Sequence, residues 1–389
     1  MTIRLLLFSL FSITVQAQSE NDYYRFSADL YHNLNKDTTA WRYQMSATQF
    51  SISGYYKTGL EIWDKNGVRK PNPMSSQDSL LFFKSKQLKA KDYIVDRSKN
   101  EQIIIINEAH TNARHRTFTR SLLKGLYDNG YRYLGLEALQ DTIINRRKFP
   151  VLDSGVYTKE PEFGNLLSEA LQIGFTVFGY EASEGKNRKE REIEQARNIQ
   201  AFIDSHPKGK VLIHCGHDHV FENEHKTWEK AMAGRIKEYT GIDPFTINQI
   251  PYTEKGSPEF NPPYINQITE NDPVVLRTES GTLFNGLSAP KQTDIIVLFP
   301  PTRYEKGRPN WLQTGKVSYI LPKKKIKNSP LLIAAYRTKE YEQQGIPADI
   351  IEITEKNVIP PLYLAPGTYD IIIKDKTYKI QDRYSVTLK

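Results

Sequence analysis

The sequence has 389 residues, of which 39% are hydrophobic and 11% aromatic, and a formal net charge of +8. This length exceeds the usual size of one domain, so two or three domains are expected, and the aromatic content excludes a disordered chain. The basic residues are scattered, and their one dense run, at residues 323–327, is typical of a solvated loop, so no nucleic-acid partner is expected. The single cysteine, Cys215, excludes an internal disulfide framework and a zinc site with several cysteine ligands.

The first residues have the pattern of a secretory signal peptide. Arg4 supplies the positive charge, residues 5–15 form an apolar run of 11 residues, and Val15 and Ala17 occupy the positions that a signal peptidase inspects. The run is too short to span a bilayer, and no later stretch is long enough for a transmembrane segment. We therefore expect a signal peptide over residues 1–17 and an exported protein, periplasmic or secreted.

The sequence does not determine the structure of the N-terminal segment at residues 18–87. After this segment, strands and helices alternate regularly. In the N-terminal segment, short β-prone pieces such as residues 49–56 are mixed with polar residues. The later strands are expected at residues 102–107, 131–136, 175–180, 210–214, 244–248 and 295–299, and the helical stripes at residues 118–127, 163–171, 193–203 and 228–239. This alternation predicts an α/β domain over residues 88–322, with a mostly parallel sheet and helices on both faces.

The helical period disappears after about residue 322. Residues 331–336, 349–354, 369–374 and 384–388 alternate like strands, and the pair Pro366-Gly367 is typical of a turn between two of them. We therefore expect a small C-terminal all-β domain over residues 323–389.

Carboxylates and imidazoles follow four of the predicted parallel strands. The carboxyl ends of such strands share one edge of the sheet, where ligands bind. A carboxylate directly after a strongly apolar strand is either a helix-capping anion or a functional group. Such groups are rarely buried without a function, so a functional role is favoured for Glu108 and for His110 in the same loop. A capping role is equally open for Glu137, and Glu181 begins a charged loop where a solvated carboxylate would be ordinary. The fourth strand leads into a segment that contains His214, His217 and His219.

Six of the eight histidines lie in two short segments near these strand ends: His110, His115, His214, His217, His219 and His225. Imidazole transfers protons near neutral pH and also binds metals. His214 lies within a strand and is expected to be packed, whereas His115 and His225 are expected at exposed helix starts. Cys215 is expected to be a small buried residue, because a reactive thiol needs a specific electropositive site.

These segments resemble the ChaN-like haem-uptake proteins, which are grouped with the Tiki and TraB proteins and the erythromycin esterases. The resemblance rests on the run Ile-Ile-Ile-Ile-Asn-Glu108-Ala-His110, on Leu-Gly-Leu-Glu137, and on Arg191-Glu192 followed by the Gly-x-x-His-Val pattern that begins at Gly216. It covers about residues 88–250. Asn107 stands where these proteins usually have glycine, and the Glu-x-His spacing matches the ChaN and Tiki form rather than that of the esterases.

The resemblance implies a catalytic site made of Glu108, His110, Glu137 and His219, with His217 and Glu181 behind them. In an exported hydrolase, His110 would act as a general base on a water, oriented by Glu108. The other two residues would position an ester or peptide substrate or stabilise developing charge.

Two other hypotheses remain open. In a metal-dependent hydrolase, Glu108, His110, His217 and His219 would hold a divalent ion that activates the water. The alternative is a haem- or iron-binding uptake protein of ChaN type, without catalysis, with a histidine or tyrosine ligand. The sequence leaves the substrate, the choice between metal and haem, and the oligomeric state open.

Overall fold

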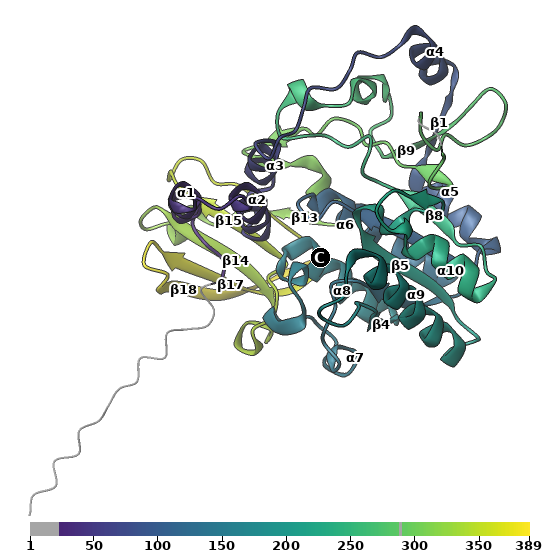
Figure 1. Cartoon of the computed structure of the whole chain (residues 1–389). Helices are drawn as coiled ribbons and strands as arrows, with labels where there is room; N and C mark the ends of the chain where they lie inside the picture. The colour runs from purple at the N-terminus through teal and green to yellow at the C-terminus, as the bar shows by residue number, and fades with distance from the viewer. Residues whose placement is uncertain (1–22, 288–289) are drawn as a thin grey trace, which may run out of the picture.

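The structure is a computed structural model, which describes residues 23–287 and 290–389 (Figure 1). The expected signal peptide at residues 1–17 lies outside these residues. No helix in the described part of the chain is both long and apolar enough to cross a membrane.

The central element is a six-stranded sheet with the strand order β10-β8-β2-β5-β3-β4. Every neighbouring pair in this sheet is parallel. The strands are β2 (Ile103–Glu108), β3 (Tyr131–Leu136), β4 (Thr176–Gly179), β5 (Lys210–Gly216), β8 (Phe245–Asn248) and β10 (Ile295–Ile296). The predicted α/β class with a parallel sheet is confirmed, and the predicted bounds of β3 agree with the structure.

Helices cover both faces of this sheet, as predicted. On one face, Ile104 and Ile106 pack in a core cluster with α5 (Ala90–Arg97), α6 (Ala113–Asp128) and α8 (Pro161–Ile173). On the other face, Ile103 and Ile105 pack with α9 (Arg188–Ser205) and α10 (Met232–Thr240). Side chains alternate between the two faces of a strand, so the run of four isoleucines reflects burial on both sides.

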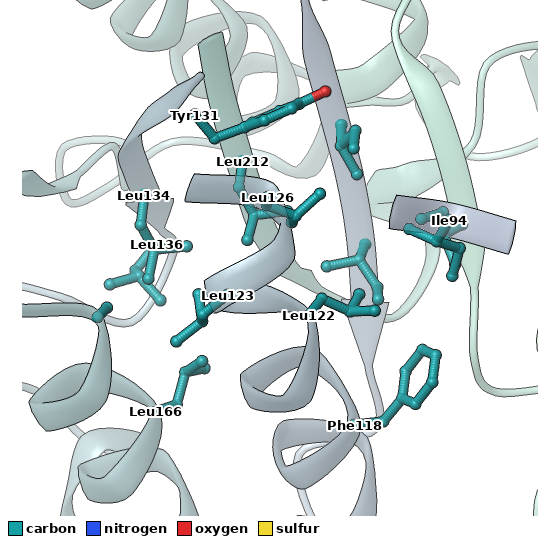
Figure 2. Close-up of a cluster of buried hydrophobic side chains, with 14 of the residues drawn as sticks. Ile94, Phe118, Leu122, Leu123, Leu126, Tyr131, Leu134, Leu136, Leu166 and Leu212 are labelled. Atoms are coloured by element: carbon teal, nitrogen blue, oxygen red, sulfur yellow. The ribbon is translucent and has the colours of Figure 1, made fainter. Parts of the chain in front are cut away.

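The α6 helix supplies the apolar stripe that the sequence predicts. In Figure 2, its residues Leu122, Leu123 and Leu126 lie close to Leu134 and to the other labelled leucines of β3 and β5. The first turn of α6 follows directly from the loop after β2, so packing of this stripe also fixes the position of that loop.

The N-terminal segment is helical, and the β-prone interpretation of residues 49–56 was wrong. Its helices are α1 (Ser27–Lys36), α2 (Arg42–Ile52), α3 (Tyr56–Asp64) and α4 (Ser76–Lys84). Phe50 is fully buried in a small core with Leu30, Leu34 and Ile62 from the neighbouring helices. Packing on this helical stripe outweighs the local strand propensity, which is a weak and context-dependent preference.

The last helix of the α/β part begins later than its apolar pattern predicts. A short hairpin of β6 (Glu224–His225) and β7 (Glu229–Lys230) comes first, and α10 begins at Met232, whose backbone N–H donates to the Glu192 carboxylate at 2.8 Å. The hairpin places the Trp228 ring on His225, with ring centroids 4.1 Å apart. His225 therefore does not lie at an exposed helix start, as was predicted, and its side chain is 16% exposed.

The C-terminal part contains an antiparallel four-stranded sheet with the order β15-β14-β17-β18. Its strands are β14 (Leu331–Arg337), β15 (Asp349–Ile353), β17 (Gly367–Asp375) and β18 (Ile380–Leu388). A strand at β13 (Val317–Tyr319) pairs with β16 (Leu362–Leu364). The predicted all-β character of this region is confirmed.

The remaining elements are short. They are β1 (Lys86–Lys89), which pairs with β9 (Val274–Arg277), α7 (Ile144–Arg147), β11 (Tyr304–Glu305) and β12 (Arg308–Pro309).

Candidate functional site

The carboxyl ends of four adjacent strands carry the residues that the sequence singled out. The strands β4, β3, β5 and β2 are neighbours in the sheet, so their following residues meet at one edge. The residues at this edge are Glu181 after β4, Glu137 after β3, His217 and His219 after β5, and Glu108 and His110 at the end of β2.

Glu108 is a buried carboxylate that a guanidinium binds with two parallel hydrogen bonds. The Arg116 Nε and Nη2 groups donate to its two oxygens, each at 2.6 Å, and its residue exposure is 1%. Burial alone would raise the pKa of Glu108, but the charge of Arg116 outweighs this and holds that pKa well below its ordinary value. Glu108 is therefore ionised, and as a carboxylate it can only accept hydrogen bonds.

This ionised state determines which nitrogen of His110 carries a proton. The Nδ1 atom of His110 lies 3.0 Å from Glu108 Oε1, so in the neutral ring Nδ1 holds the hydrogen and Nε2 holds the lone pair. The ring stacks on Tyr157, with centroids 4.0 Å apart and planes 12° apart. The His110 side chain is 21% exposed, so solvent reaches an imidazole that is fixed in tautomer and orientation.

Gly216 lies directly against this imidazole. A Cβ atom built on Gly216 would stand 2.6 Å from His110 Nε2, 2.3 Å from His110 Cε1 and 3.2 Å from Glu137 Oε2. Real Cβ atoms do not approach other atoms to less than 3.0 Å, so any side chain here would displace the ring. The absence of a side chain at residue 216 lets the Nε2 edge and the Glu137 carboxylate approach the same point.

Arg116 also connects the site to more distant elements. Its Nη1 group donates to Glu160 at 3.0 Å, and the hydroxyl of Tyr56 in α3 donates to the same carboxylate at 3.1 Å. Glu160 in turn accepts the backbone N–H groups of Glu162 and Phe163, which caps the start of α8.

Glu137 and Glu181 share a second guanidinium at the exposed rim of the site. Arg191 Nη2 donates to both carboxylates at 2.5 Å, and the Gly216 backbone N–H donates to Glu137 at 2.6 Å. Burial would raise the pKa of Glu137, but the charges of His219, His110 and Arg191 outweigh it and lower the pKa to about 2. The side chains of Arg191 and Glu181 remain 34% and 28% exposed.

His219 lies between this rim and a buried carboxylate. Its Nδ1 bonds Glu192 at 2.8 Å, and its Nε2 lies 3.0 Å from Arg191 Nη1 and 3.5 Å from Glu137 Oε1. Burial lowers the pKa of His219, but Glu137 and Glu192 outweigh burial and raise it. Since Glu192 accepts from Nδ1–H and a guanidinium can only donate, Nε2 of the neutral ring accepts the Arg191 N–H, and a proton that His219 takes up goes to Nε2.

The other histidines of the two clusters contribute packing and shape. His217 contacts His110 edge to face, with centroids 5.0 Å apart, and burial lowers its pKa. His214, within β5 as expected, packs against Phe163 at 5.6 Å, and burial lowers its pKa to about 4. Its Nε2 lies 3.5 Å from Glu108 Oε2.

The expectation of a solvent-facing His115 was wrong. This residue is fully buried in the first turn of α6, and its Nδ1 accepts the Ala109 backbone N–H at 3.0 Å. This hydrogen bond from Ala109 to His115 fixes the backbone of the loop between Glu108 and His110. Cys215 is buried, as expected, and burial raises the pKa of its thiol well above the ordinary value.

The four residues predicted as metal ligands do not converge on one point. Both oxygens of Glu108 bind Arg116, and Arg191 occupies the side of His219 that a metal would approach. Among residues 23–287 and 290–389, no group of three or more His, Cys, Asp or Glu side chains is placed to hold a metal ion. The residues therefore do not fit a divalent ion in this arrangement, and we derive no step through one.

Sequence reasoning missed three residues that organise the site. Arg191 and Glu192 were named only as part of the family resemblance and were given no role in the site, but Arg191 joins two site carboxylates and Glu192 is 1% exposed. Arg116 was not considered, because a charged residue in an amphipathic helix usually faces solvent. The available signals were the Arg191-Glu192 pair within the family resemblance and the position of Arg116 in the helix turn that follows His110.

No protein-family profile matches the chain, and no curated protein matches its sequence. Solved structures similar to it include the type III effector HopBA1, at 11% identity and a TM-score of 0.35, over 56% of this chain and 96% of that one. RRSP, a MARTX toxin effector domain from Vibrio vulnificus CMCP6, is 13% identical, with a TM-score of 0.30, over 51% of this chain and 44% of that one. A structure described as bacterial protein toxins is 14% identical, with a TM-score of 0.32, over 55% of this chain and 48% of that one. Likenesses this weak identify neither a family nor an activity.

Proposed function

We propose that the chain is an exported hydrolase that cleaves an ester or peptide bond at the His110 site, and that it belongs to the ChaN/Tiki/erythromycin-esterase-like superfamily its motifs resemble. The observation that carries the proposal is the 3.0 Å contact between His110 Nδ1 and the Glu108 carboxylate, from which the tautomer of the neutral ring follows. An ionised Glu108 binds Nδ1, and the Nε2 lone pair is left beside Gly216 and Glu137. A solvent-accessible imidazole held in this way is the arrangement that general-base catalysis requires.

In the proposed reaction, His110 Nε2 accepts a proton from a water molecule as that water attacks the substrate carbonyl. Glu108 stabilises the imidazolium that forms, and Arg116 keeps Glu108 ionised throughout. The attack places negative charge on the carbonyl oxygen, which the partly exposed Arg191 guanidinium can bind.

His219 is the proposed proton donor to the leaving group. Its raised pKa lets it carry a proton closer to neutral pH than an ordinary histidine. In the proposed step, Arg191 Nη1 leaves Nε2 for the substrate oxygen, and the protonated Nε2, 3.5 Å from Glu137, donates to the leaving group. A carboxylate binds Nδ1 of both histidines, so their separate tasks come from their other neighbours: Nε2 of His110 lies against Gly216, whereas Glu137 beside Nε2 of His219 adds to the charge that raises its pKa.

The test is hydrolysis of a panel of chromogenic esters and fluorogenic peptides by the purified chain that starts at Gln18. His110→Ala is expected to reduce kcat/KM for any substrate found by at least about 10²-fold, the ordinary contribution of a general base. Its free energy of unfolding should change by no more than about 1 kcal/mol. The matched control is His32→Ala, at an exposed histidine of α1, which should leave both values unchanged. Full activity in His110→Ala would reject the proposal.

The alternative of haem binding has a separate test. A haem-binding protein of ChaN type would show a Soret band when the purified chain is mixed with haem, and His110→Ala or Tyr157→Phe would abolish that band. No Soret band is expected if the site is hydrolytic. Export is tested by sequencing the N-terminus of the cellular protein, which should begin at or near Gln18.

A further inference from the structure

A second region with binding chemistry lies beside α6, formed by residues other than those of the His110 site. A cavity of about 520 Å³ is bounded by the first turn of α5, by residues 271–273 and by the turn at Asn310–Gln313. This volume is within the range of small-molecule pockets, roughly 300–1,000 Å³. Its lining includes the aromatic residues Phe118, Phe299 and Trp311, and also Ser121.

Arg114 is the charged side chain that marks this cavity. It lines the cavity but is only 6% exposed. Its Nη1 group donates to the Pro300 carbonyl oxygen at 2.7 Å and to the Thr302 hydroxyl at 3.3 Å, and its Cζ atom lies 4.9 Å from the centre of the Phe299 ring. These contacts hold the guanidinium in place and use two of its five N–H groups.

The charge of Arg114 has no carboxylate partner within ion-pair distance among residues 23–287 and 290–389. Burial lowers the pKa of Arg114 to about 10, although the charge of Glu254, which forms no ion pair with it, opposes this shift in part. The buried arginines Arg116 and Arg308 differ, because Glu108 and Asp349 outweigh burial there and raise the pKa. A buried cation without a partner is unfavourable unless something else binds it, and the free N–H groups on Nε and Nη2 have the parallel spacing that a carboxylate matches.

The other charges around the cavity favour a ligand with a single negative charge. Lys89 is already paired with Asp272 at 3.2 Å, and Lys91 and Asp92 at the rim carry opposite charges. Arg114 is the remaining cation of the lining, and Glu254, which lies outside the lining and forms no ion pair with Arg114, offsets its charge only in part.

We propose that this cavity binds a small aromatic monocarboxylate, whose carboxylate pairs with Arg114 and whose ring lies against Phe118 and Trp311. The cavity shares no lining residue with the His110 site, so this binding goes beyond the proposed hydrolase activity and does not depend on it. The guanidinium supplies the specificity for a carboxylate, and the rings supply the apolar contact area.

The experiment measures binding of 1-naphthoate and of its neutral analogue 1-naphthamide to the purified chain by isothermal titration calorimetry. Naphthoate should bind, and naphthamide should bind at least tenfold more weakly. Arg114→Gln should weaken naphthoate binding at least tenfold, while the exposed control Arg132→Gln should not. Equal binding of the two probes, or unchanged naphthoate binding in Arg114→Gln, would overturn the proposal, as would tighter binding of phenyl phosphate.

A second variant covers the case in which Arg114→Gln fails to fold. Ser121→Leu keeps Arg114 but fills part of the cavity from α6, where leucine is well tolerated, and it should also weaken naphthoate binding at least tenfold. His110→Ala should leave naphthoate binding unchanged. If His110→Ala abolishes binding instead, the probe occupies the reaction site and the proposed second site is wrong, whatever the outcome for hydrolysis.

Discussion

The two halves of the candidate site use the same pair of residue types at very different exposures. In the inner half, the side chains of Arg116 and Glu108 are 1% and 2% exposed. In the rim half, those of Arg191 and Glu181 are 34% and 28% exposed. In both halves the Nε and Nη2 groups of the arginine donate to the two oxygens of one carboxylate. The two ion pairs therefore differ in their exposure to solvent rather than in their hydrogen bonds.

This difference assigns the two arginines to different tasks. A buried ion pair becomes strongly destabilising when one partner is removed, because the other charge cannot reach water. An exposed pair is screened by solvent and contributes little to stability, but its donors remain accessible to a ligand. Arg116 should therefore act mainly on the fold and on His110 through Glu108, and Arg191 mainly on the substrate.

The largest expected effect is that of Arg116→Met. This change leaves Glu108 and Glu160 as buried carboxylates without their guanidinium, so the free energy of unfolding should fall by about 3–5 kcal/mol. Urea unfolding monitored by circular dichroism measures it, with the exposed Arg132→Met as the control. If the free energy of unfolding falls by less than about 1 kcal/mol, the buried Arg116 pair contributes no more to stability than the exposed Arg191 pair, and the proposed difference between the two arginines is wrong.

The next effect is that of Arg191→Gln at the rim. Removing one charge-stabilising donor should lower kcat by about 10²–10³-fold on any substrate that the chain hydrolyses. The free energy of unfolding should change by about 1 kcal/mol or less, because the side chain is 34% exposed. Retention of full kcat, or a loss of stability as large as that of Arg116→Met, would contradict the assignment.

Glu222 extends the comparison to a carboxylate without a guanidinium partner. Burial, together with Asp294 and Asp243, raises the pKa of Glu222 to about 7 in the folded state. The folded protein then holds this proton more tightly than the unfolded chain, so stability should fall as pH rises from about 4.5 to about 7. Glu222→Gln should remove this loss and stabilise the protein at pH 8 by up to about 3 kcal/mol.

The Glu222 prediction is checked by urea unfolding at several pH values, with Glu184→Gln at an exposed position as the control. The difference between Glu222→Gln and the natural chain should vanish at pH 4. A difference that grows toward low pH would have the wrong sign and would refute the raised pKa.

The smallest effect is expected at an exposed pair on the same helix as Arg116. Lys124 and Asp128 in α6 lie 2.6 Å apart, with side chains 70% and 56% exposed. Lys124→Ala should change the free energy of unfolding by about 0.3–0.5 kcal/mol, and high salt should remove the difference. A loss above about 1 kcal/mol would show that exposure does not separate the two classes of ion pair in this protein.

The apolar pattern of the sequence was sufficient to predict the sheet and the edge at which the candidate site residues meet. Strand burial on both faces leaves a run of isoleucines, and a helix leaves a stripe every three or four residues, so both can be recognised locally. The elements whose patterns are mixed were predicted less well. Residues 49–56 form the end of α2, a turn and the start of α3 rather than a strand, and the stripe from Trp228 begins before the helix does. There, packing against other segments outweighs the local preference.

The sequence by itself determined which residues leave the strands of the sheet, and hence that Glu108, Glu137 and His219 lie along one edge. Only the tertiary structure decided how these residues are charged and oriented. Arg116 and Arg191 lie on amphipathic helices, where a charged residue ordinarily faces water, so the helical pattern alone does not show that they face the site. The packing of α6 and α9 over the edge brings each guanidinium to its carboxylates, and burial then sets the strength of each pair.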